Sequence, residues 1–275
     1  MSFYTSLSGL KGAQTDLSVI SNNLANVSST GFKKSRAQFG DLFASSPTQS
    51  TKMQAGQGVR LNAVVQQFTQ GTLEATDKTF DLAIAGEGYF VTRGDPPRDA
   101  VTYTRNGAFQ ANANRQVVDT IGSTLQLLPV DASGNVTSAT LASATDFILP
   151  TSTPTNPNIS LVNVSIGVDG LVTATYADGS DEMLGTVAMA SFTAQEGLRP
   201  VGDSHWQSTG ESGAPAIDGA TNGALGTIRS GALERANVDV TEELVALISA
   251  QRNFQANAKA IETASNMTQA IVAIR

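Results

Sequence analysis

The hydrophobic residues at the N-terminal end of the chain recur at helical spacing. Apolar side chains follow one another at alternating steps of three and four residues, at Leu10, Ala13, Leu17, Ile20, Leu24 and Val27. This is the pattern of a helix that packs along another helix. The helix is expected to end within residues 28–31, where Gly31 can adopt the left-handed conformation that terminates helices.

The C-terminal end of the chain carries a second helical stripe. The last Pro is Pro215 and the last Gly is Gly231, so one long helix is favoured beyond residue 231. Asp239 followed by Glu242 fits an N-terminal capping pattern, which predicts the start of this helix. Its stripe has heptad spacing through Val240, Leu244, Leu247, Gln251, Phe254, Ala258 and Ile261. Beyond Ile261 the apolar residues leave this heptad register and continue at Ala264, Met267, Ile271 and Ile274. A change of supercoil pitch is expected there.

The region between the two stripes has the character of β-strands. Short segments rich in β-branched and aromatic residues occupy residues 59–68, 80–84, 89–92, 125–128, 162–166, 171–176 and 185–189. Turn sequences separate them, namely Asn106-Gly107, Asp169-Gly170, Asp178-Gly179 and the tight turn at residues 85–88. Short strands with frequent turns are typical of an antiparallel β domain. Residues 131–160, with several Pro, Ser and Thr residues, are expected to form a loop-rich excursion from it.

These patterns predict an α+β fold, in which a discontinuous terminal α-helical coiled coil accompanies an antiparallel β-rich domain. The expected boundaries are an N-terminal helix over residues 1–31, a β-rich domain over 32–231 and a C-terminal helix over 232–275. The two helices are expected to pair with each other. On this division, removing both helices leaves a soluble, folded β domain.

A pair of helices buries only one side of each helix, so the pair alone is marginally stable. In one interpretation the helices simply pack on each other and cap the β domain. In the other, which we favour, neighbouring copies of the chain cover the remaining helix faces. On this hypothesis Leu247→Asp abolishes assembly, and Gln251→Glu has a milder effect. The side chains expected at the assembly interface are Leu10, Leu17, Ile20, Leu24, Val27, Leu244, Leu247, Phe254 and Ile261.

Composition argues against several classes of function. The chain has 17 Lys and Arg against 24 Asp and Glu, and its net charge of −7 disfavours binding to nucleic acid. The absence of Cys excludes thiolate chemistry, and the single histidine, His205, excludes multi-histidine metal sites. Beside Trp206, His205 is interpreted as a packed surface-loop residue. No catalytic motif accompanies it, so neither enzymatic activity nor a cofactor or metal is expected.

The charged and terminal segments suggest where the chain acts. Lys33, Lys34 and Arg36 are interpreted as a solvated basic face, with pairing to acidic neighbours in an assembly as the alternative. No apolar run is long enough to cross a bilayer, so no membrane insertion is expected. The first ten residues lack the features of a secretory signal. The chain is therefore expected either to remain in the cytosol or to be exported by another route.

Four segments of the chain resemble motifs of bacterial flagellar rod and hook proteins. Residues 21–33 resemble the N-terminal signature of that family, residues 237–254 resemble its C-terminal signature, and residues 81–90 and 103–109 resemble internal segments. The resemblance covers most of the chain. The family-motif residues are Asn22, Asn23, Asn26, Gly31, Phe32, Asn237, Glu243, Gln251 and Arg252.

The resemblance implies a structural subunit of a homopolymer. In that family the terminal helices of many subunits form layers of coiled coil around an export channel, and the β domains form the outer wall. The implied partners are the adjacent rod and hook–filament junction proteins, together with the hook cap and the type III export apparatus during assembly. The implied location is the hook, outside the cell, or the periplasm for a rod subunit.

Two segments favour one member of the family. Residues 185–202 and 231–238 are similar to the hook subunit, and the link from Phe43 to Gly58 lacks the longer insertion of the distal rod protein. The resemblance thus implies a short hook subunit, part of a flexible universal joint that transmits torque from rod to filament. The alternative is a distal or proximal rod subunit, part of a stiff drive shaft. The lack of large outer domains favours that alternative.

A hypothesis from a different class is a secreted β-rich binding module, such as an adhesin, whose helices trimerise. That module forms a discrete oligomer, whereas a flagellar subunit forms an open helical polymer because head-to-tail contacts that do not close propagate. Electron microscopy of negatively stained, concentrated protein separates these two hypotheses.

Overall fold

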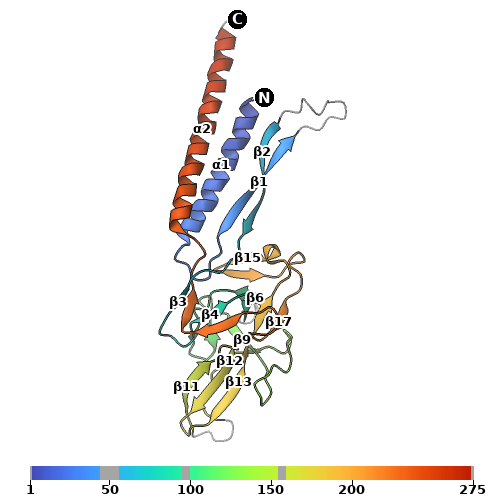
Figure 1. Ribbon diagram of the computed structural model, residues 1–275, viewed down its shortest axis with the longest axis vertical. Coiled ribbons are helices and arrows are strands. Elements are labelled where there is room, and N and C mark those ends of the chain that lie inside the picture. The colour runs from blue at the N-terminus through green and yellow to red at the C-terminus, as the bar shows by residue number, and fades with distance from the viewer. Residues whose placement is uncertain (1, 44–55, 95–99, 154–158, 274–275) are drawn as a thin grey trace. The chain divides into compact units, whose positions relative to one another are not determined.

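The computed structural model describes residues 2–43, 56–94, 100–153 and 159–273 (Figure 1). These residues form two compact units. The first, called the helical unit below, is drawn from residues 1–27, 33–67 and 238–275. The second, called the β unit, is drawn from residues 28–32 and 68–237.

The helical unit consists of two long helices and a β-hairpin. Helix α1 spans Ser2–Ala25 and helix α2 spans Val240–Ala273. The two helices lie side by side, and α2 extends past the beginning of α1 (Figure 1). Strands β1, Ser35–Phe43, and β2, Gly56–Gln66, pair antiparallel. This hairpin packs along α1, since a Cβ atom added to Gly12 would lie 3.5 Å from the side chains of both Phe39 and Val59.

The beginning of α2 agrees with the predicted cap. Asp239 Oδ1 accepts hydrogen bonds from the backbone N–H groups of Glu242 and Thr241, at 3.1 and 2.7 Å. These two bonds hold the pKa of the Asp239 carboxyl below its usual range. The cap therefore stabilises the helix fully when the pH is above the ordinary pKa of an aspartate, and this stabilisation is lost as the pH falls through the lowered pKa. The Glu242 carboxylate does not complete a reciprocal capping box. It forms an ion pair with Lys34 at 3.3 Å.

The end of α1 differs from the prediction. The helix ends at Ala25, and residues 26–31 form turns, so Gly31 does not terminate the helix. Gly31 does adopt a positive φ of 67°. The reason lies in the β unit, where a Cβ atom at this position would lie 2.6 Å from the backbone nitrogen of Asn106. Sequence reasoning therefore identified the conformation of Gly31 but not its cause.

The β unit is built from antiparallel strands. Its main sheet has the order β11-β12-β13-β9-β5-β6-β16-β15, and two small sheets pair β18 with β4 and β19 with β3. The elements are β3 Leu73–Ala75, β4 Leu82–Ala85, β5 Tyr89–Arg93, β6 Val101–Thr104, β7 Gln110–Ala111, β8 Val117–Val118, β9 Thr124–Leu128, β10 Thr145–Asp146, β11 Leu161–Ile166, β12 Leu171–Tyr176, β13 Asp181–Val187, β14 Met189–Ser191, the 3-10 helix η2 Gln195–Gly197, β15 Arg199–Gly202, β16 His205–Gln207, β17 Ala216–Asp218, β18 Thr227–Ser230 and β19 Ala232–Glu234.

Each of the predicted strand segments overlaps an observed strand: β2, β4, β5, β9, β11, β12 and β13. The hairpin turns between β11, β12 and β13 are also confirmed. Gly170 and Gly179 both have φ of 79°, which favours glycine, and the aspartate before each accepts a backbone hydrogen bond two residues further on. Residues 85–88 connect β4 to β5 as expected.

Strand β5 lies between two hydrophobic clusters. Phe90 packs in one cluster with Leu82 and many aliphatic residues, while its neighbours Tyr89 and Val91 pack in the other. Tyr89 meets Trp206 edge-to-face in that second cluster, with ring centroids 5.7 Å apart. Because side chains alternate across a strand, burial of consecutive residues means that both faces of β5 are covered.

The segment expected to be a loop-rich excursion packs back onto the sheet. Most of residues 131–153 and 159–160 are turns and loops, but β10 pairs with β9. Phe147 is fully buried, its N–H donates to Leu125 O, and its C=O accepts from Val117 N. Burial of a phenylalanine side chain and pairing of its backbone hold the segment in place. Pro154 and Pro157 lie outside the described residues.

The boundaries expected at residues 31 and 232 differ from the division in the structure. Residues 33–67 belong to the helical unit because the β1–β2 hairpin packs along α1. Residues 232–234 form β19, which pairs with β3, although they contain no helix breaker. Lack of breakers permits a helix but does not favour it over a strand with a partner. A fragment that keeps the whole β unit therefore has to include residues 28–32 and 68–237.

Candidate assembly site

The two helices face each other through one stripe on each. On α2, the buried and half-buried positions are Glu243, Ala246, Leu247, Ala250, Phe254, Asn257, Ala258, Ile261 and Ala264. The helices approach closely, since a Cβ atom added to Gly9 would lie 2.8 Å from Asn257 Oδ1. The residues of this stripe are buried or half-buried within a single chain, without contact to another copy.

The structure places the predicted residues at different depths. Among the predicted interface residues, Ile20 is buried and Leu244 is exposed, while those half-buried are Leu10, Leu17, Leu24, Val27, Leu247, Phe254 and Ile261. Among the family-motif residues, the buried ones are Asn23, Gly31 and Glu243, the half-buried ones are Asn26, Phe32 and Asn237, and the exposed ones are Asn22, Gln251 and Arg252.

The buried stripe of α2 is rotated relative to the predicted heptad. Glu243 and Ala250 are buried where Leu244 and Gln251 were expected. The spacing rule counts apolar residues, so it passes over a glutamate. Here Glu243 is buried because a hydrogen-bond partner on α1 accompanies it. Leu247, Phe254 and Ile261 are common to both registers.

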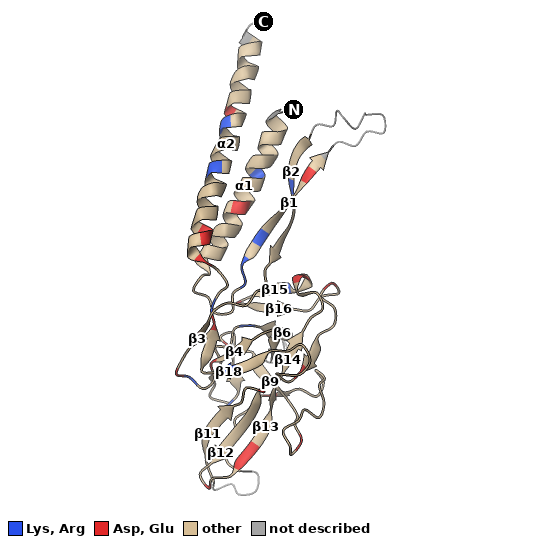
Figure 2. Cartoon of the chain, in the orientation of Figure 1, with Lys and Arg blue, Asp and Glu red and all other residues tan. Residues whose placement is uncertain are grey.

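Two groups of apolar side chains on α2, within residues 240–248 and 267–272, stay exposed in the single chain. Ile248 retains 49% of its accessible surface and Val272 retains 70%. The others are Val240, Leu244, Val245, Met267 and Ile271. Beyond Glu262, α2 carries no charged residue as far as Ala273, where its described part ends (Figure 2). Large exposed apolar patches on proteins in general often belong to protein–protein interaction sites.

Asn23 ties three elements of the helical unit together. Its side-chain amide pairs with the Ser35 backbone in both directions, accepting from Ser35 N at 2.9 Å and donating to Ser35 O at 2.9 Å. The same Nδ2 donates to Glu243 Oε2 at 3.3 Å. Asn23 lies on α1, Ser35 begins β1 and Glu243 lies on α2. A single buried amide therefore fixes the hairpin and both helices.

We expect Asn23→Asp to lower the free energy of unfolding of the helical unit by about 3–5 kcal/mol. The new carboxylate cannot donate to Ser35 O, and it faces the buried carboxylate of Glu243. Urea unfolding followed by far-UV circular dichroism measures the loss. The matched control is Asn22→Asp, the same change at an exposed neighbour. Equal stability of the two variants contradicts the role of Asn23.

The basic cluster is not simply a solvated face. Lys33 is buried, Lys34 pairs with Glu242, and Arg36 is exposed. Lys34, Arg36 and Asp16 line a cleft of about 470 Å³ beside the Asn23 amide. Burial raises the pKa of the Asp16 carboxyl, and the nearby Arg36 guanidinium opposes that rise. The expectation of a solvated cluster is therefore wrong for Lys33, whose place was not evident from its charge.

Residues 28–32 dock on the β unit through backbone groups. Gly31 N donates to Glu234 O at 2.8 Å, and Ser204 Oγ donates to Thr30 O at 3.1 Å. Asn237 N donates to Phe32 O at 3.4 Å. The two terminal family motifs thus meet within one folded unit, because the first supplies residues 30–32 and the second supplies Asn237.

A buried ion pair supports this docking, and sequence reasoning missed it. Arg105 Nη1 lies 3.2 Å from Glu234 Oε2, and Gly71 N donates to Glu234 Oε1 at 2.8 Å. The Arg105 guanidinium also lies over the ring of Tyr89, 5.3 Å from its centroid. Both side chains of the ion pair are almost fully buried. Two residues could have pointed to this ion pair. Arg105 is the one charged residue of segment 103–109, and Glu234 is the one acidic residue of segment 231–238, and both segments resemble the family.

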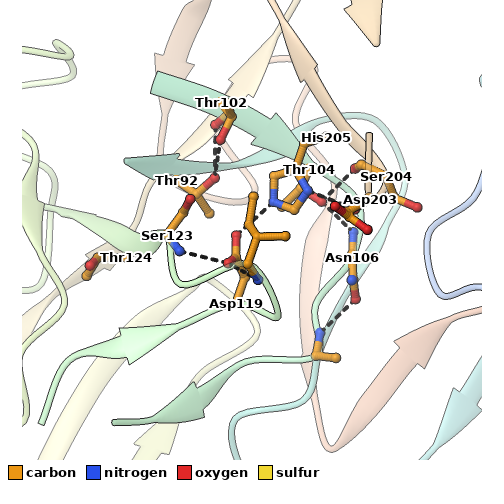
Figure 3. Close-up of polar contacts among 12 residues, drawn as sticks. Thr92, Thr102, Thr104, Asn106, Asp119, Ser123, Thr124, Asp203, Ser204 and His205 are labelled. Carbon is orange, nitrogen blue, oxygen red and sulfur yellow. Dashed lines mark hydrogen bonds and ion pairs between the residues drawn. The ribbon is translucent and has the colours of Figure 1, made fainter. Parts of the chain in front are cut away.

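The single histidine is buried, so its interpretation as a surface-loop residue is wrong. His205 begins β16, where its Nε2 lies 2.7 Å from Asp119 Oδ2 and its Nδ1 lies 2.8 Å from Asp203 O (Figure 3). Acceptor oxygens therefore face both ring nitrogens. No ring nitrogen remains to take a proton from a hydroxyl group, as a serine–histidine relay requires.

These features define an α+β protein with exposed apolar side chains on a long terminal helix. Three family profiles match the chain. They are described as flagella basal body rod protein, for residues 3–33; flagellar hook protein FlgE/F/G D1 domain, for residues 83–174; and flagellar basal body rod FlgEFG protein C-terminal, for residues 229–274.

Relatives match over nearly the whole chain. The flagellar basal-body rod protein FlgG of Buchnera aphidicola is 33% identical, covering 98% of this chain and 97% of its own length. FlgG of Bacillus subtilis is 32% identical, with 100% and 98% covered. The flagellar hook protein FlgE of Escherichia coli is 26% identical over an alignment of 413 residues that covers both chains fully.

The chain belongs to the family of flagellar rod and hook proteins. Proteins of this family are structural, and the chain is not an enzyme. A solved structure of the Helicobacter pylori hook protein FlgE2 aligns with 66% of this chain and 46% of its own, at 18% identity and a TM-score of 0.25. Within the described residues, neither helix is both long and apolar enough to span a membrane.

Proposed function

We propose that this chain is a subunit of the flagellar rod, where copies assemble into a stiff tubular shaft. The observation that carries the proposal is the length of the alignments, which shows how much is inserted within the matched region. Alignments to rod proteins named FlgG cover 98–100% of this chain and 97–98% of theirs within 280–286 positions. Alignment to the Escherichia coli hook protein needs 413 positions for a chain of 275 residues, so that protein carries large insertions relative to this one.

The hook subunit, which residues 185–202 and 231–238 favoured, is therefore the less supported member of the family. Those segments are short, the first within the β unit and the second ending one residue beyond it, and they say nothing about what is inserted elsewhere. The link between Phe43 and Gly58 was the other argument for a hook, and its residues 44–55 lie outside the described residues.

Assembly in this proposal uses the helical unit. The helices of neighbouring copies, layered as a coiled coil, cover the exposed apolar residues of α2, among them Val245 and Ile248. The axial partners are then the proteins before and after this subunit in the rod, and the type III export apparatus delivers the chain.

A deletion strain tests rod against hook. If the chain is a rod subunit, basal bodies purified from cells lacking the gene are expected to end within the rod, without a hook. Basal bodies with a complete rod and no curved external segment contradict the rod proposal and support the hook. Restoring the gene on a plasmid is the control, and it is expected to restore both structures.

A further inference from the structure

The β unit contains the same three-residue sequence twice. Asn106-Gly107-Ala108 follows β6, and Asn222-Gly223-Ala224 lies between β17 and β18. An asparagine that precedes a glycine can react with its own backbone, because the glycine nitrogen reaches the side-chain carbonyl carbon and no Cβ atom obstructs the approach. Since the two copies agree in all three residues, a difference in their reactivity reflects mainly the fold around them.

The fold encloses the first copy. Asn106 keeps only 8% of its accessible surface, and its Oδ1 accepts a hydrogen bond from Ala108 N at 3.1 Å. The Asn106 backbone N–H donates to Thr104 Oγ1 at 2.9 Å (Figure 3). Gly107 is packed against backbone, since a Cβ atom added there would overlap with Leu82 O. The peptide group between Asn106 and Gly107 therefore cannot turn unless these contacts break.

The second copy lies in an open turn at the surface. Residues 221–224 are all exposed, and a Cβ atom added to Gly223 would meet no atom within 4 Å beyond its two chain neighbours. The Gly223 N–H has no hydrogen-bond partner among the described residues. The Asn222 side chain donates from Nδ2 to Asp218 Oδ1 at 3.1 Å, and water can replace this exposed bond. Both the side chain and the nitrogen that attacks it are thus accessible to solvent.

We propose that Asn222 is a site of spontaneous deamidation, at which the chain supplies the nucleophile and water supplies the new oxygen. The Gly223 nitrogen loses its proton to solvent base and forms a bond to Asn222 Cγ. The Cγ–Nδ2 bond breaks, and the nitrogen takes up a proton and leaves as ammonia. Water then opens the succinimide ring at either carbonyl, which gives aspartate or isoaspartate. The net reaction converts an amide and water into a carboxylic acid and ammonia, without an oxidant or reductant.

The product disturbs the turn that contains it. A carboxylate at residue 222 cannot donate to Asp218 Oδ1, and it places a second negative charge beside that carboxylate. In isoaspartate the main chain also runs through the former side chain, which lengthens the turn. Two backbone bonds close this turn, from Thr221 N to Gly226 O at 3.0 Å and from Leu225 N to Asn222 O at 3.1 Å. We expect both bonds to open more often after the reaction, in a rod or a hook subunit alike.

Peptide mapping of the full-length protein tests the proposal. The protein is incubated at mildly alkaline pH, where the glycine nitrogen loses its proton more readily, and is then digested in acid for mass spectrometry. The peptide with Asn222 is expected to gain the mass of the amide-to-acid change at least about tenfold faster than the peptide with Asn106, because ring closure at Asn106 first breaks buried hydrogen bonds. In guanidinium chloride the two rates are expected to become similar, since both sites are Asn-Gly-Ala.

Three results overturn the proposal. If Asn222 does not convert in the folded protein, it is not a deamidation site. If Asn106 converts as fast as Asn222 in the folded protein, burial and hydrogen bonding do not protect the first copy. If the unfolded chain shows the same difference between the two peptides as the folded protein, flanking side chains determine the rates and the fold does not.

Two variants test the effect on the turn. Asn222→Asp carries the aspartate product in every molecule, and hydrogen exchange at the Thr221 N–H is expected to be about two- to tenfold faster than in freshly prepared wild type. Asn222→Gln keeps an amide but closes a ring less readily because its side chain is longer, so its exchange is expected to stay constant during incubation. The Gly179 N–H, which donates to Tyr176 O in another turn, is the reference. Wild-type exchange in Asn222→Asp overturns the expected loosening of the turn.

Discussion

Replacing Ile248 with Asp is expected to abolish assembly while leaving the single chain folded. Ile248 keeps 49% of its surface accessible and lies on the face of α2 turned away from the buried stripe. Covering such a side chain in a polymer contributes roughly 1.5–3 kcal/mol, and forcing a carboxylate into the contact costs several kcal/mol more. Each 1.4 kcal/mol changes the critical concentration about tenfold. Sedimentation of purified protein and motility of a complemented strain measure the effect.

Two controls keep this prediction specific. Val162→Asp makes the same kind of change at an exposed position of β11 in the β unit, and we expect it to leave assembly intact. Leu247→Asp is less informative, because Leu247 is half-buried and its replacement also weakens the packing of the helices within one chain. Normal motility of the Ile248→Asp strain, with polymers at the usual protein concentration, shows that the exposed apolar group within residues 240–248 is not an interface.

The fold was predictable where a residue's own neighbours determine it. Strand β12 alternates between buried and half-buried positions, and its turns contain Asp-Gly pairs, so local pattern was sufficient. Strand β1 has the mixed sequence SRAQFGDLF and pairs with β2 through register shifts, one of them between Gln38 and Phe39. A strand of that kind is defined by its partner, and its own sequence shows little alternation.

The site was predictable only in part for a similar reason. Apolar spacing located Leu247, Phe254 and Ile261, because a helix repeats its buried face at a regular interval. The same rule could not place Glu243, whose burial depends on Asn23 at the other end of the chain. Long-range polar pairing leaves no periodic signal in a sequence, and it decides the register of α2.

Replacing Glu234 with Gln is expected to lower the free energy of unfolding of the β unit by about 3–5 kcal/mol. Glutamine keeps an oxygen for the Gly71 N–H, but its NH2 group then takes the place of the oxygen that accepts from Arg105. The variant therefore removes the charge and replaces an acceptor with a donor that faces the guanidinium. The Arg105 guanidinium then stays buried without a carboxylate, and its Nε has no hydrogen-bond partner among the described residues. The single tryptophan, Trp206, is buried in this unit, and its fluorescence during urea unfolding measures the loss.

The neighbouring ion pair provides a matched control on the paired strand. Glu74, on β3, binds Arg235, and both side chains of that pair are about half exposed. Glu74→Gln therefore removes the same charge from a solvated pair, and we expect little change in stability because solvent screens exposed ion pairs. The difference in stability that we expect between Glu234→Gln and Glu74→Gln therefore comes from the burial of Glu234. If Glu234→Gln proves as stable as Glu74→Gln, the buried pair does not support the docking of residues 28–32, and the backbone bonds of Gly31 and Phe32 hold the segment by themselves.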